Sequence, residues 1–357
     1  MGAKLMTSKI KLSEFMLLGS SLKKLNKVGS GSREIRYYEL LSSSLDITLF
    51  TYDQEEYVTD CFMTKCLSPI RCNKYIKSLI GPFLAPKNGH SKRSVVRCKQ
   101  IWGSWAALIY ARLTKSTYIV RIGYVWTYSV KAEHSDKLLY KIIKNVLNIF
   151  ENILVRFGDA YIFASPDIEK RFKPFIKNKP SKIIENGFDI SIFYDDLNEK
   201  KYDFIYVGRF IKTKKIDKIA SILNSGHSIA IGNGPYHGDF LPHVKIYDKM
   251  LNHELPKYYR TAKCYVSLSK TEGSPKSVIE AILCGCYPIL SNIPAHNYII
   301  NQLGYGLLLN ELDECDADEI LKGNIKIDYK KLKNFKKHYD MHHIVHKEVE
   351  FIKEIIS

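Results

Sequence analysis

The 357-residue sequence contains no hydrophobic run long enough to cross a bilayer. Its longest apolar stretches, such as Phe15–Gly19 and Ile101–Ala111, are interrupted or far shorter than the roughly 20 residues that a membrane-spanning helix needs. The apolar segment Phe15–Leu18 is also too short for a secretory signal, and Met6 stands where a myristoylation signal has Ser or Thr. These absences predict a cytoplasmic protein that is not processed at its N-terminus.

The sequence also lacks cysteine pairs at the spacing of metal or redox motifs. Its eight cysteines include no Cys-x-x-Cys pair and are spread over a long chain. Cys61, Cys66 and Cys72 lie close together, but their spacing fits no common zinc site. We therefore expect free thiols in a reducing compartment, with neither a metal site nor a cofactor.

Acidic residues are scarce in the first half of the chain. Residues 1–190 hold 31 Lys and Arg against 16 Asp and Glu, whereas residues 191–357 hold 23 against 21, so the net charge of +17 is concentrated in the first half. This asymmetry favours a domain that faces a polyanion, either nucleic acid or the anionic inner leaflet of a membrane. A lysine-rich proteome is the alternative explanation, but it predicts an equal excess in both halves.

Strand and helix patterns alternate along the chain, which predicts parallel α/β layers. The length favours two domains, and we place their boundary at the turn signal Asn186-Gly187. Residues 53–100, with three prolines and a basic stretch, are expected to form an irregular surface loop. In the first half we expect strands at Glu14–Gly19, Asp46–Tyr52, Thr117–Ile122 and Tyr161–Ser165, and helices at Arg33–Ser43 and Ile101–Leu113. In the second half we expect strands at Asp203–Val207, Ser228–Gly232, Val244–Tyr247, Cys264–Leu268, Pro288–Leu290 and Gly306–Leu309.

The segment Ser269–Gly285 contains the strongest local signals for a ligand site. Ser274 is a good N-cap, Pro275 suits the first helical position and Gly285 is placed to end the helix. A helix of about ten residues is therefore predicted. Its N-terminus, with the positive end of the helix dipole, is suited to bind phosphate.

Two glutamates flank this predicted anion site. Glu272 lies in the loop before the helix, and Glu280 lies eight residues later on its second turn, while the free amides belong to Ser274, Lys276 and Ser277. Carboxylates repel phosphate, so we expect them to accept hydrogen bonds from neutral hydroxyls, such as those of a ribose and a sugar. The alternative is a pair of unrelated surface glutamates.

With this spacing, the segment resembles the Glu-x7-Glu motif of the retaining glycosyltransferases of family 4, which have the GT-B fold. Further segments follow in the order found in that family, and they are Asn186–Asp189, Gly208-Arg209-Phe210 with Lys214, Gly232-Asn-Gly234-Pro235 and Ser291–His296. The likeness covers residues 160–310. It implies an α/β fold with two Rossmann-like, doubly wound parallel-sheet domains that face a central cleft. Its expected parts are an acceptor-binding domain at 1–187, a donor-binding domain at 188–328, and a C-terminal helix at 329–357 that crosses back to the N-terminal domain.

The resemblance also implies roles for individual residues. Arg209 and Lys214 would form a cationic clamp for the donor diphosphate, and Lys212 and Lys215 are alternatives to Lys214. The predicted catalytic residues are Glu272, Arg209, Lys214 and His134. The predicted donor-binding residues are Gly31, Gly208, Arg209, Lys214, Gly273, Ser274, Lys276, Ser277 and Glu280, and no metal is predicted.

The first half departs from the family pattern. Gly29–Ser32 resembles the glycine-rich loop of the acceptor domain, which is why Gly31 is assigned to donor binding. Many family members have a histidine just after the strand that corresponds to Thr117–Ile122, whereas this chain has Arg121, Gly123 and Tyr124 in that region. His134, a few residues later, is the candidate for that missing histidine.

The activity implied is that of a retaining, metal-independent hexosyltransferase. It would move a sugar from a nucleotide-diphosphate sugar, which is a substrate and not a cofactor, to a saccharide or lipid-linked acceptor in the synthesis of cell-envelope polysaccharide or lipopolysaccharide. The basic first half would bind the acceptor and contact the inner face of an anionic membrane peripherally.

Three other interpretations stay open at this point. The same fold also serves nucleotide-sugar epimerases and sugar phosphorylases. A basic nucleic-acid-binding protein would explain the charge, but the sequence has no recognisable reader motif, so no nucleic acid is expected. Asp316-Ala-Asp318 mimics a metal-binding Asp-x-Asp motif, but it lies in an acidic run and is interpreted as a solvated helix start.

Overall fold

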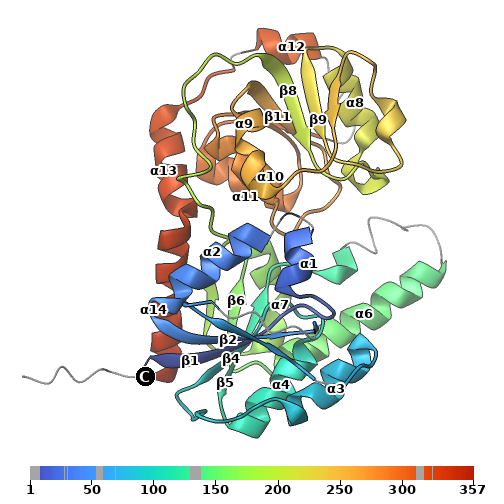
Figure 1. The fold of residues 1–357 in the computed structure, drawn as a ribbon. Coiled ribbons are helices and arrows are strands. Elements are labelled where there is room, and N and C mark those ends of the chain that lie inside the picture. Colours follow the sequence, from blue (N-terminus) through green and yellow to red (C-terminus); the bar gives the residue numbers. More distant parts are fainter. Residues whose placement is uncertain are drawn as a thin grey trace, which may run out of the picture. The chain divides into compact units, whose positions relative to one another are not determined.

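The computed structural model consists of two compact α/β units (Figure 1). It describes residues 9–27, 29, 31–53, 59–68, 70–128, 138–310, 317–323 and 325–357. The first unit comprises Met1–Tyr124, Asn148–Ile184 and Val345–Ser357, and the second comprises Val125–Leu147 and Glu185–Ile344. The last residues of the chain therefore belong to the first unit, although they follow the second unit in sequence.

Each unit is built on a parallel β-sheet. A seven-stranded sheet has the order β3-β2-β1-β4-β5-β6-β7, and a six-stranded sheet has the order β10-β9-β8-β11-β12-β13. The strands of the first sheet are β1 (Ile10–Phe15), β2 (Leu45–Thr51), β3 (Met63–Cys66), β4 (Val95–Cys98), β5 (Thr117–Ile122), β6 (Ala160–Phe163) and β7 (Ser181–Ile183). The strands of the second are β8 (Tyr202–Val207), β9 (Ser228–Ile231), β10 (Lys245–Tyr247), β11 (Ala262–Ser267), β12 (Tyr287–Ser291) and β13 (Leu307–Leu309).

Helices connect most consecutive strands, and the last three described helices follow the last strand. In the first half they are α1 (Leu22–Lys27), α2 (Gly31–Ser42), α3 (Lys74–Leu84), α4 (Ser104–Thr114), α6 (Leu138–Arg156) and α7 (Pro166–Ile176). In the second half they are α8 (Ile216–Asn224), α9 (Pro256–Tyr259), α10 (Lys276–Leu283), α11 (Pro294–Leu303), α12 (Ala317–Lys322), α13 (Tyr329–Tyr339) and α14 (Met341–Ile356).

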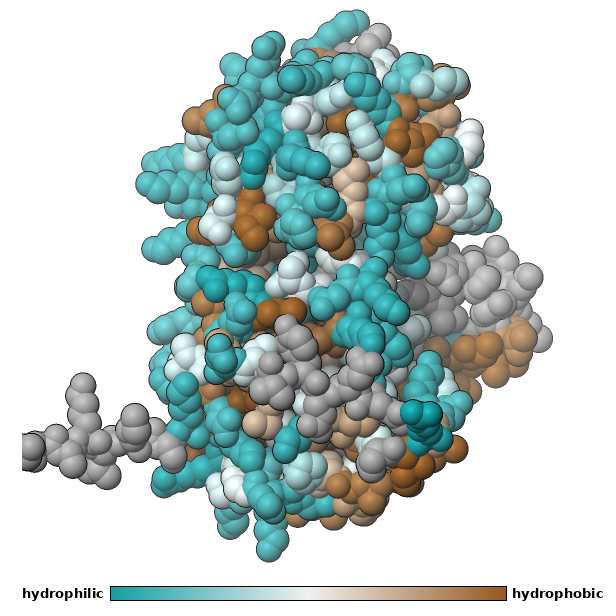
Figure 2. Space-filling view, viewed as in Figure 1, coloured by the Kyte–Doolittle hydropathy of each residue, from teal (hydrophilic) through white to brown (hydrophobic). Residues whose placement is uncertain are grey.

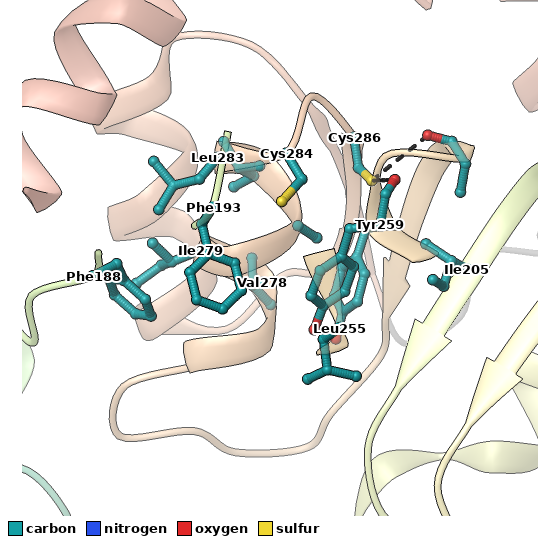
Figure 3. Close-up of a cluster of buried hydrophobic side chains, with 14 of the residues drawn as sticks. Phe188, Phe193, Ile205, Leu255, Tyr259, Val278, Ile279, Leu283, Cys284 and Cys286 are labelled. Carbon is teal, nitrogen blue, oxygen red and sulfur yellow. Dashed lines mark hydrogen bonds between the residues drawn. The ribbon is translucent and has the colours of Figure 1, made fainter. Parts of the chain in front are cut away.

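Strand β8 shows why the second sheet is buried on both faces. Successive side chains of a strand point to opposite faces. Phe204 and Tyr206 accordingly belong to one core cluster, which includes buried residues of α8. Ile205 belongs to the other cluster, which includes buried residues of α9, α10 and α11 (Figure 3). The expected α/β fold with two parallel sheets is confirmed.

Several expected elements are found close to their predicted places. The strand at Thr117–Ile122 has the predicted bounds, and all six strands expected in the second half are present within two residues of their predicted ends. The strand expected at Glu14–Gly19 is wrong in position, because β1 spans Ile10–Phe15. The apolar residues after it form a turn instead, which is closed by a hydrogen bond from the Ser20 amide to the Leu17 carbonyl (2.8 Å).

The irregular loop expected at residues 53–100 is also wrong for the described residues, since these include β3, α3 and β4. Helix α3 begins after Asn73, whose side chain accepts a hydrogen bond from the Tyr75 amide (3.0 Å), and this is a standard N-cap. Pro82 lies within the last turn of α3, where a proline interrupts little of the remaining helix. The prolines in this stretch therefore favoured a loop in the prediction, although one of them, Pro82, lies inside a regular helix.

The expected C-terminal helix is two helices. Asp340, between α13 and α14, has the non-helical backbone angles φ −58° and ψ 128°. At this break the Phe188 amide donates to the Tyr339 carbonyl, and the Met341 amide donates to the Phe188 carbonyl, both at 2.9 Å. The chain segment that contains Phe188 thus provides the hydrogen bonds that the interrupted helix loses.

Candidate functional site

The motif helix α10 is held by the hydrophobic core of the second unit. Its residues Val278, Ile279 and Leu283 are buried in the cluster shown in Figure 3. Helix α10 ends as predicted before Gly285, which has φ 81° and whose Cβ, if present, would lie 2.3 Å from the Asp195 carboxyl carbon. Only glycine fits this backbone conformation and this contact without strain.

The predicted start of α10 is wrong by one residue. The helix begins at Lys276 and Pro275 occupies the cap position, so the Ser274 side chain does not cap it. The Ser274 hydroxyl instead accepts a hydrogen bond from the Asn186 side-chain amide (2.8 Å). That bond, to a residue far away in sequence, explains why the local capping signal failed. The first turn of α10 still presents backbone amides without intrahelical partners, the feature that binds anions.

The loops that follow β8 and β9 are hydrogen-bonded to each other through their backbones. The Gly208 amide donates to the Ile231 carbonyl (3.0 Å), and the Phe210 amide donates to the Asn233 carbonyl (2.9 Å). Gly232 has φ 150°, and a Cβ at this position would lie 1.8 Å from the Gly208 carbonyl oxygen. The Gly-x-Gly-Pro segment is therefore needed for the close approach of the two loops.

Lys214 and Glu272 form an ion pair at the same end of the sheet. Lys214 ends a 3-10 turn at Lys212–Lys214, and the Lys270 amide donates to the Thr213 carbonyl (2.9 Å), which draws the loop before α10 onto this turn. The Lys214 ammonium contacts Glu272 Oε1, and the two side chains are 21% and 18% exposed. The structure thus brings a predicted cation and a predicted carboxylate into one partly open site.

Tyr206 connects Arg209 to this pair. Its hydroxyl donates to the Arg209 carbonyl (2.9 Å). The pKa of Tyr206 is raised, first by burial and then by the negative charge of Glu272, while the positive charge of Arg209 opposes the shift. Both charges therefore act on one hydroxyl, and the Arg209 residue is exposed.

Glu280 is buried and already hydrogen-bonded within the second unit. Its residue surface is 2% exposed, and its carboxylate accepts hydrogen bonds from Asn252 Nδ2 (2.9 Å) and the Tyr259 hydroxyl (3.4 Å). Burial raises the pKa of Tyr259 well above its ordinary value, and the charge of Glu280 adds to this effect. On the same helix, the Ser277 hydroxyl accepts a hydrogen bond from Tyr265 (2.7 Å). The sequence patterns contained no signal for these three partners.

His296 was not assigned a role from sequence, yet it lies beside the Lys214–Glu272 pair. Its side chain is fully buried, and Nδ1 donates to the Ser291 carbonyl (3.0 Å), which leaves Nε2 unprotonated. Among the described residues Nε2 has no hydrogen-bond partner. Burial lowers the pKa of His296 to about 4, and Glu272 opposes this shift while Lys214 adds to it. The imidazole is therefore neutral near pH 7 and presents a lone pair.

Of the remaining predicted residues, some lie in other parts of the structure and some lie outside the described residues. Gly31 is the first residue of α2 in the first unit, where a Cβ would lie 1.6 Å from Asn26 Oδ1, so it belongs to a helix and not to the expected loop. His134 and Asp316 lie outside the described residues. Gly208 and Gly273 lie in the loops that carry Arg209 and Glu272, and Lys276 opens α10.

Arg121, which stands near the place of the family histidine, has a structural partner. Its guanidinium donates to Glu348 on α14 (Nη1 to Oε2, 3.1 Å). The same carboxylate also pairs with the buried Arg97, whose guanidinium in turn binds Glu14. All four residues belong to the first unit. Arg121 is thus part of a buried ion network.

Sequence comparisons match part of the second half of the chain to known proteins. Residues 240–338 match the family model described as glycosyl transferases group 1. A segment aligned over 143 residues is 32% identical to the capsular polysaccharide biosynthesis glycosyltransferase CapH of Staphylococcus aureus. This alignment covers 35% of this chain and 39% of CapH, so the chain matches about two fifths of that relative.

Structural comparisons cover nearly the whole chain. A sucrose-phosphate synthase from Thermosynechococcus elongatus has a TM-score of 0.72 at 13% identity, over 97% of this chain and 99% of that one. HepE of Anabaena in complex with UDP-glucose has a TM-score of 0.68 at 12% identity, over 97% of this chain and 100% of that one. At these identities the likeness establishes the fold, which is of the GT-B type.

Proposed function

We propose that this chain, whose residues 240–338 belong to group 1 of the glycosyl transferases, transfers a sugar from a nucleotide-diphosphate sugar to a saccharide or lipid-linked acceptor. The observation that carries the proposal is the ion pair of Lys214 with Glu272 at the carboxyl end of the second sheet, where Glu272 lies in the loop that leads into α10. The similarity to CapH favours an acceptor from cell-envelope polysaccharide synthesis. The fold shared with UDP-glucose-bound HepE favours a uridine nucleotide as the donor carrier.

The proposed chemistry breaks one bond and forms another. The bond between the anomeric carbon and the diphosphate oxygen breaks, the acceptor hydroxyl oxygen bonds to that carbon, and the acceptor proton leaves with the diphosphate. The departing diphosphate gains negative charge, which Arg209, Lys214 and the N-terminus of α10 would stabilise electrostatically. Because these groups supply positive charge themselves, we propose a reaction that needs no metal ion. Retention at the anomeric carbon follows the family pattern of Glu272 and Glu280.

Each carboxylate has a separate task in this proposal. Glu272, paired with Lys214 and partly exposed, would accept a hydrogen bond from a hydroxyl of the donor sugar. Glu280 would accept one from the ribose, with Asn252 and Tyr259 holding its carboxylate in a fixed orientation. Gly208, Gly273, Ser274, Lys276 and Ser277 would surround the diphosphate.

A turnover assay with separated donor and acceptor tests the proposal. The protein is incubated with UDP-, GDP- and dTDP-sugars, each with and without short envelope-type oligosaccharides or lipid-linked saccharides. We expect release of nucleoside diphosphate that depends on acceptor, persists in EDTA, and yields a product with the donor's anomeric configuration by NMR. Acceptor-independent conversion of the nucleotide sugar would identify an epimerase, and phosphate-dependent release of sugar phosphate would identify a phosphorylase. Tight nucleic-acid binding without nucleotide-sugar turnover would reject the proposal.

The location proposed for this activity is the cytoplasmic face of the membrane. Nucleotide sugars and lipid-linked acceptors meet there, and the positive charge of the first half suits contact with anionic lipid. In the described part of the chain, no helix combines the length and the apolarity that a bilayer crossing demands. Fractionation of cells with and without high salt would test a peripheral association, which salt should weaken.

A further inference from the structure

Helix α3 turns a hydrophobic face away from the core. Its side chains Lys77, Ser78 and Gly81 are buried, whereas the opposite side carries exposed large apolar residues. These are Tyr75, Ile76, Leu79, Phe83 and Leu84, between 47% and 58% exposed. Large apolar side chains gathered on one exposed face mark an interaction site more often than single exposed residues do.

Helix α6 has a similar exposed stripe. Its apolar residues Leu139, Ile142, Val146, Ile149 and Ile153 recur every three or four residues, are 45% to 64% exposed, and share one side of the helix. In its second half a different side faces the core, where Glu151 and Val155 are fully buried. The exposed stripe is therefore not the side that packs against the unit.

The tryptophans of and before α4 join the two stripes within the first unit. Trp105 donates its indole N–H to the Ser78 hydroxyl of α3 (2.8 Å). The rings of Trp105 and Trp102 contact the Phe150 ring of α6, with centroids 5.8 and 5.6 Å apart. The exposed apolar residues of α3 and of the second half of α6 are thus carried by neighbouring helices, and Figure 2 shows hydrophobic surface over both. We call these residues, together with Phe157 directly after α6, the apolar face; the others are Tyr75, Ile76, Leu79, Phe83, Leu84, Ile149 and Ile153.

The charge in the sequence around α3 has one sign. Between Asp60 and Glu133 the sequence contains no Asp or Glu, but it contains thirteen Lys and Arg, and α3 lies within this stretch. Arg71 and Lys74, at the start of α3, and Lys92 and Arg93, after it, have exposed side chains. Near Phe157 the exposed carboxylate of Asp159 is paired with Arg112 (3.1 Å). An apolar surface with exposed cations at its α3 side complements a surface that is both apolar and anionic.

We propose that the apolar face docks the first unit onto an anionic phospholipid bilayer, with α3 and α6 lying in the interface and the bordering cations at the headgroups. A second copy of the chain fits the face less well, because a two-fold contact would place the same cations opposite one another. A basic protein partner also fits less well, because the sequence around α3 has no acidic residue that could pair with it. The proposal rests on the peripheral membrane contact proposed above and assigns residues to it, but it concerns binding alone, so it can fail while the sugar transfer holds.

Vesicle sedimentation tests the proposal. The full chain is mixed with vesicles of phosphatidylcholine alone or of equimolar phosphatidylcholine and phosphatidylglycerol. The variants are L79Q/F83Q on α3 and I149Q/I153Q on α6, and the control is L241Q/L251Q, which alters two exposed leucines of the second unit. We expect binding to the anionic vesicles, weakened about tenfold or more by each test pair, since each removes two inserting apolar side chains. The control should bind like the unaltered chain.

The other outcomes overturn the proposal. If the unaltered chain does not bind anionic vesicles, or if both test pairs bind as tightly as the control, the apolar face does not dock on lipid. If light scattering shows a dimer that L79Q/F83Q converts to a monomer, the occupant is a second copy. Because all four altered residues are exposed, the thermal unfolding temperature should stay unchanged, which separates lost docking from lost folding.

Discussion

Lys214 and Glu272, which are 58 residues apart in sequence, form an ion pair at the carboxyl end of the second sheet. Each side chain neutralises the charge of the other. A diphosphate that binds beside α10 would share the lysine, whereas Glu272 would then face the neutral sugar. In the proposed reaction the pair would therefore separate the two halves of a sugar-diphosphate donor by charge.

Replacing Lys214 by alanine should lower kcat/KM for the nucleotide sugar by about 100-fold, the usual cost of losing one group that stabilises developing negative charge. The reason is that Glu272 would remain as an uncompensated negative charge near the diphosphate. Initial-rate kinetics with a saturating acceptor measure the effect. Lys212→Ala, an exposed lysine in the same 3-10 turn, is the matched control and should change kcat/KM little. Equal losses of kcat/KM in both variants would show that the effect is not specific to Lys214.

Glu280→Gln should weaken nucleoside diphosphate binding by about tenfold, because a hydrogen bond to a charged acceptor is roughly twice as strong as one to a neutral acceptor. The substitution preserves the shape of the side chain, and the amide can still accept from Asn252 through its oxygen and donate to the Tyr259 hydroxyl oxygen through its nitrogen. Competition between UDP-sugar and either uridine or pyrophosphate measures the affinity of each part. Uridine should lose affinity and pyrophosphate should not. A uniform loss for both competitors would argue against a ribose contact, and the exposed Glu199→Gln should alter neither.

The sequence was sufficient for the fold and for the loops of the site, but not for the contacts made by their side chains. Regular βαβ alternation and the order of glycine-rich turns follow local rules, and the predicted strand Thr117–Ile122 is found with the same bounds. The failed cap at Ser274 depends on Asn186, which is 88 residues away. Such partners are brought together by the tertiary fold, and local sequence patterns do not predict them.

The roles of Arg121 and His296 escaped prediction for the same reason. Arg121 was noted only as a departure from the family pattern, and its partner Glu348 lies 227 residues later on α14. His296 was visible only as part of a loop after a strand, and its burial beside Lys214 and Glu272 appears in three dimensions alone. A polar residue's role is thus harder to predict than its element, because burial and pairing decide it.

Glu348→Gln should destabilise the first unit by about 3–5 kcal/mol, the usual cost of breaking a buried ion pair by removing one partner. The Glu348 carboxylate is fully buried and serves Arg97 and Arg121, and it also accepts a hydrogen bond from the Tyr37 hydroxyl (2.7 Å). Its loss leaves two buried guanidinium groups with Glu14 as the remaining carboxylate of the network.

Hydrogen exchange of α14 and the denaturant midpoint of the first unit measure this destabilisation. The amides of α14 should exchange faster, since Glu348 attaches this helix to β4 and β5 through Arg97 and Arg121. Glu354→Gln on the same helix removes only an exposed pair with Lys182 at 3.6 Å and is the control. If both variants unfold at the same denaturant concentration, the buried network does not hold α14.

His296 should make the second unit less stable as the pH falls from about 6.5 toward 4. The imidazole of His296 has a pKa of about 4 in the folded chain, whereas the pKa of an unfolded histidine is about 6.5. Between these values the unfolded chain binds the proton and the folded chain does not, so stability is present above about pH 6.5 and is lost as the pH falls, by about 3 kcal/mol. In His296→Asn the amide keeps a donor for the Ser291 carbonyl but does not titrate, so the free energy of unfolding should depend less on pH over this window. Urea titrations at several pH values measure the slope, and the exposed His253→Asn should retain the full slope. An identical slope in His296→Asn and the unaltered chain would mean that the folded histidine takes up its proton as readily as the unfolded one.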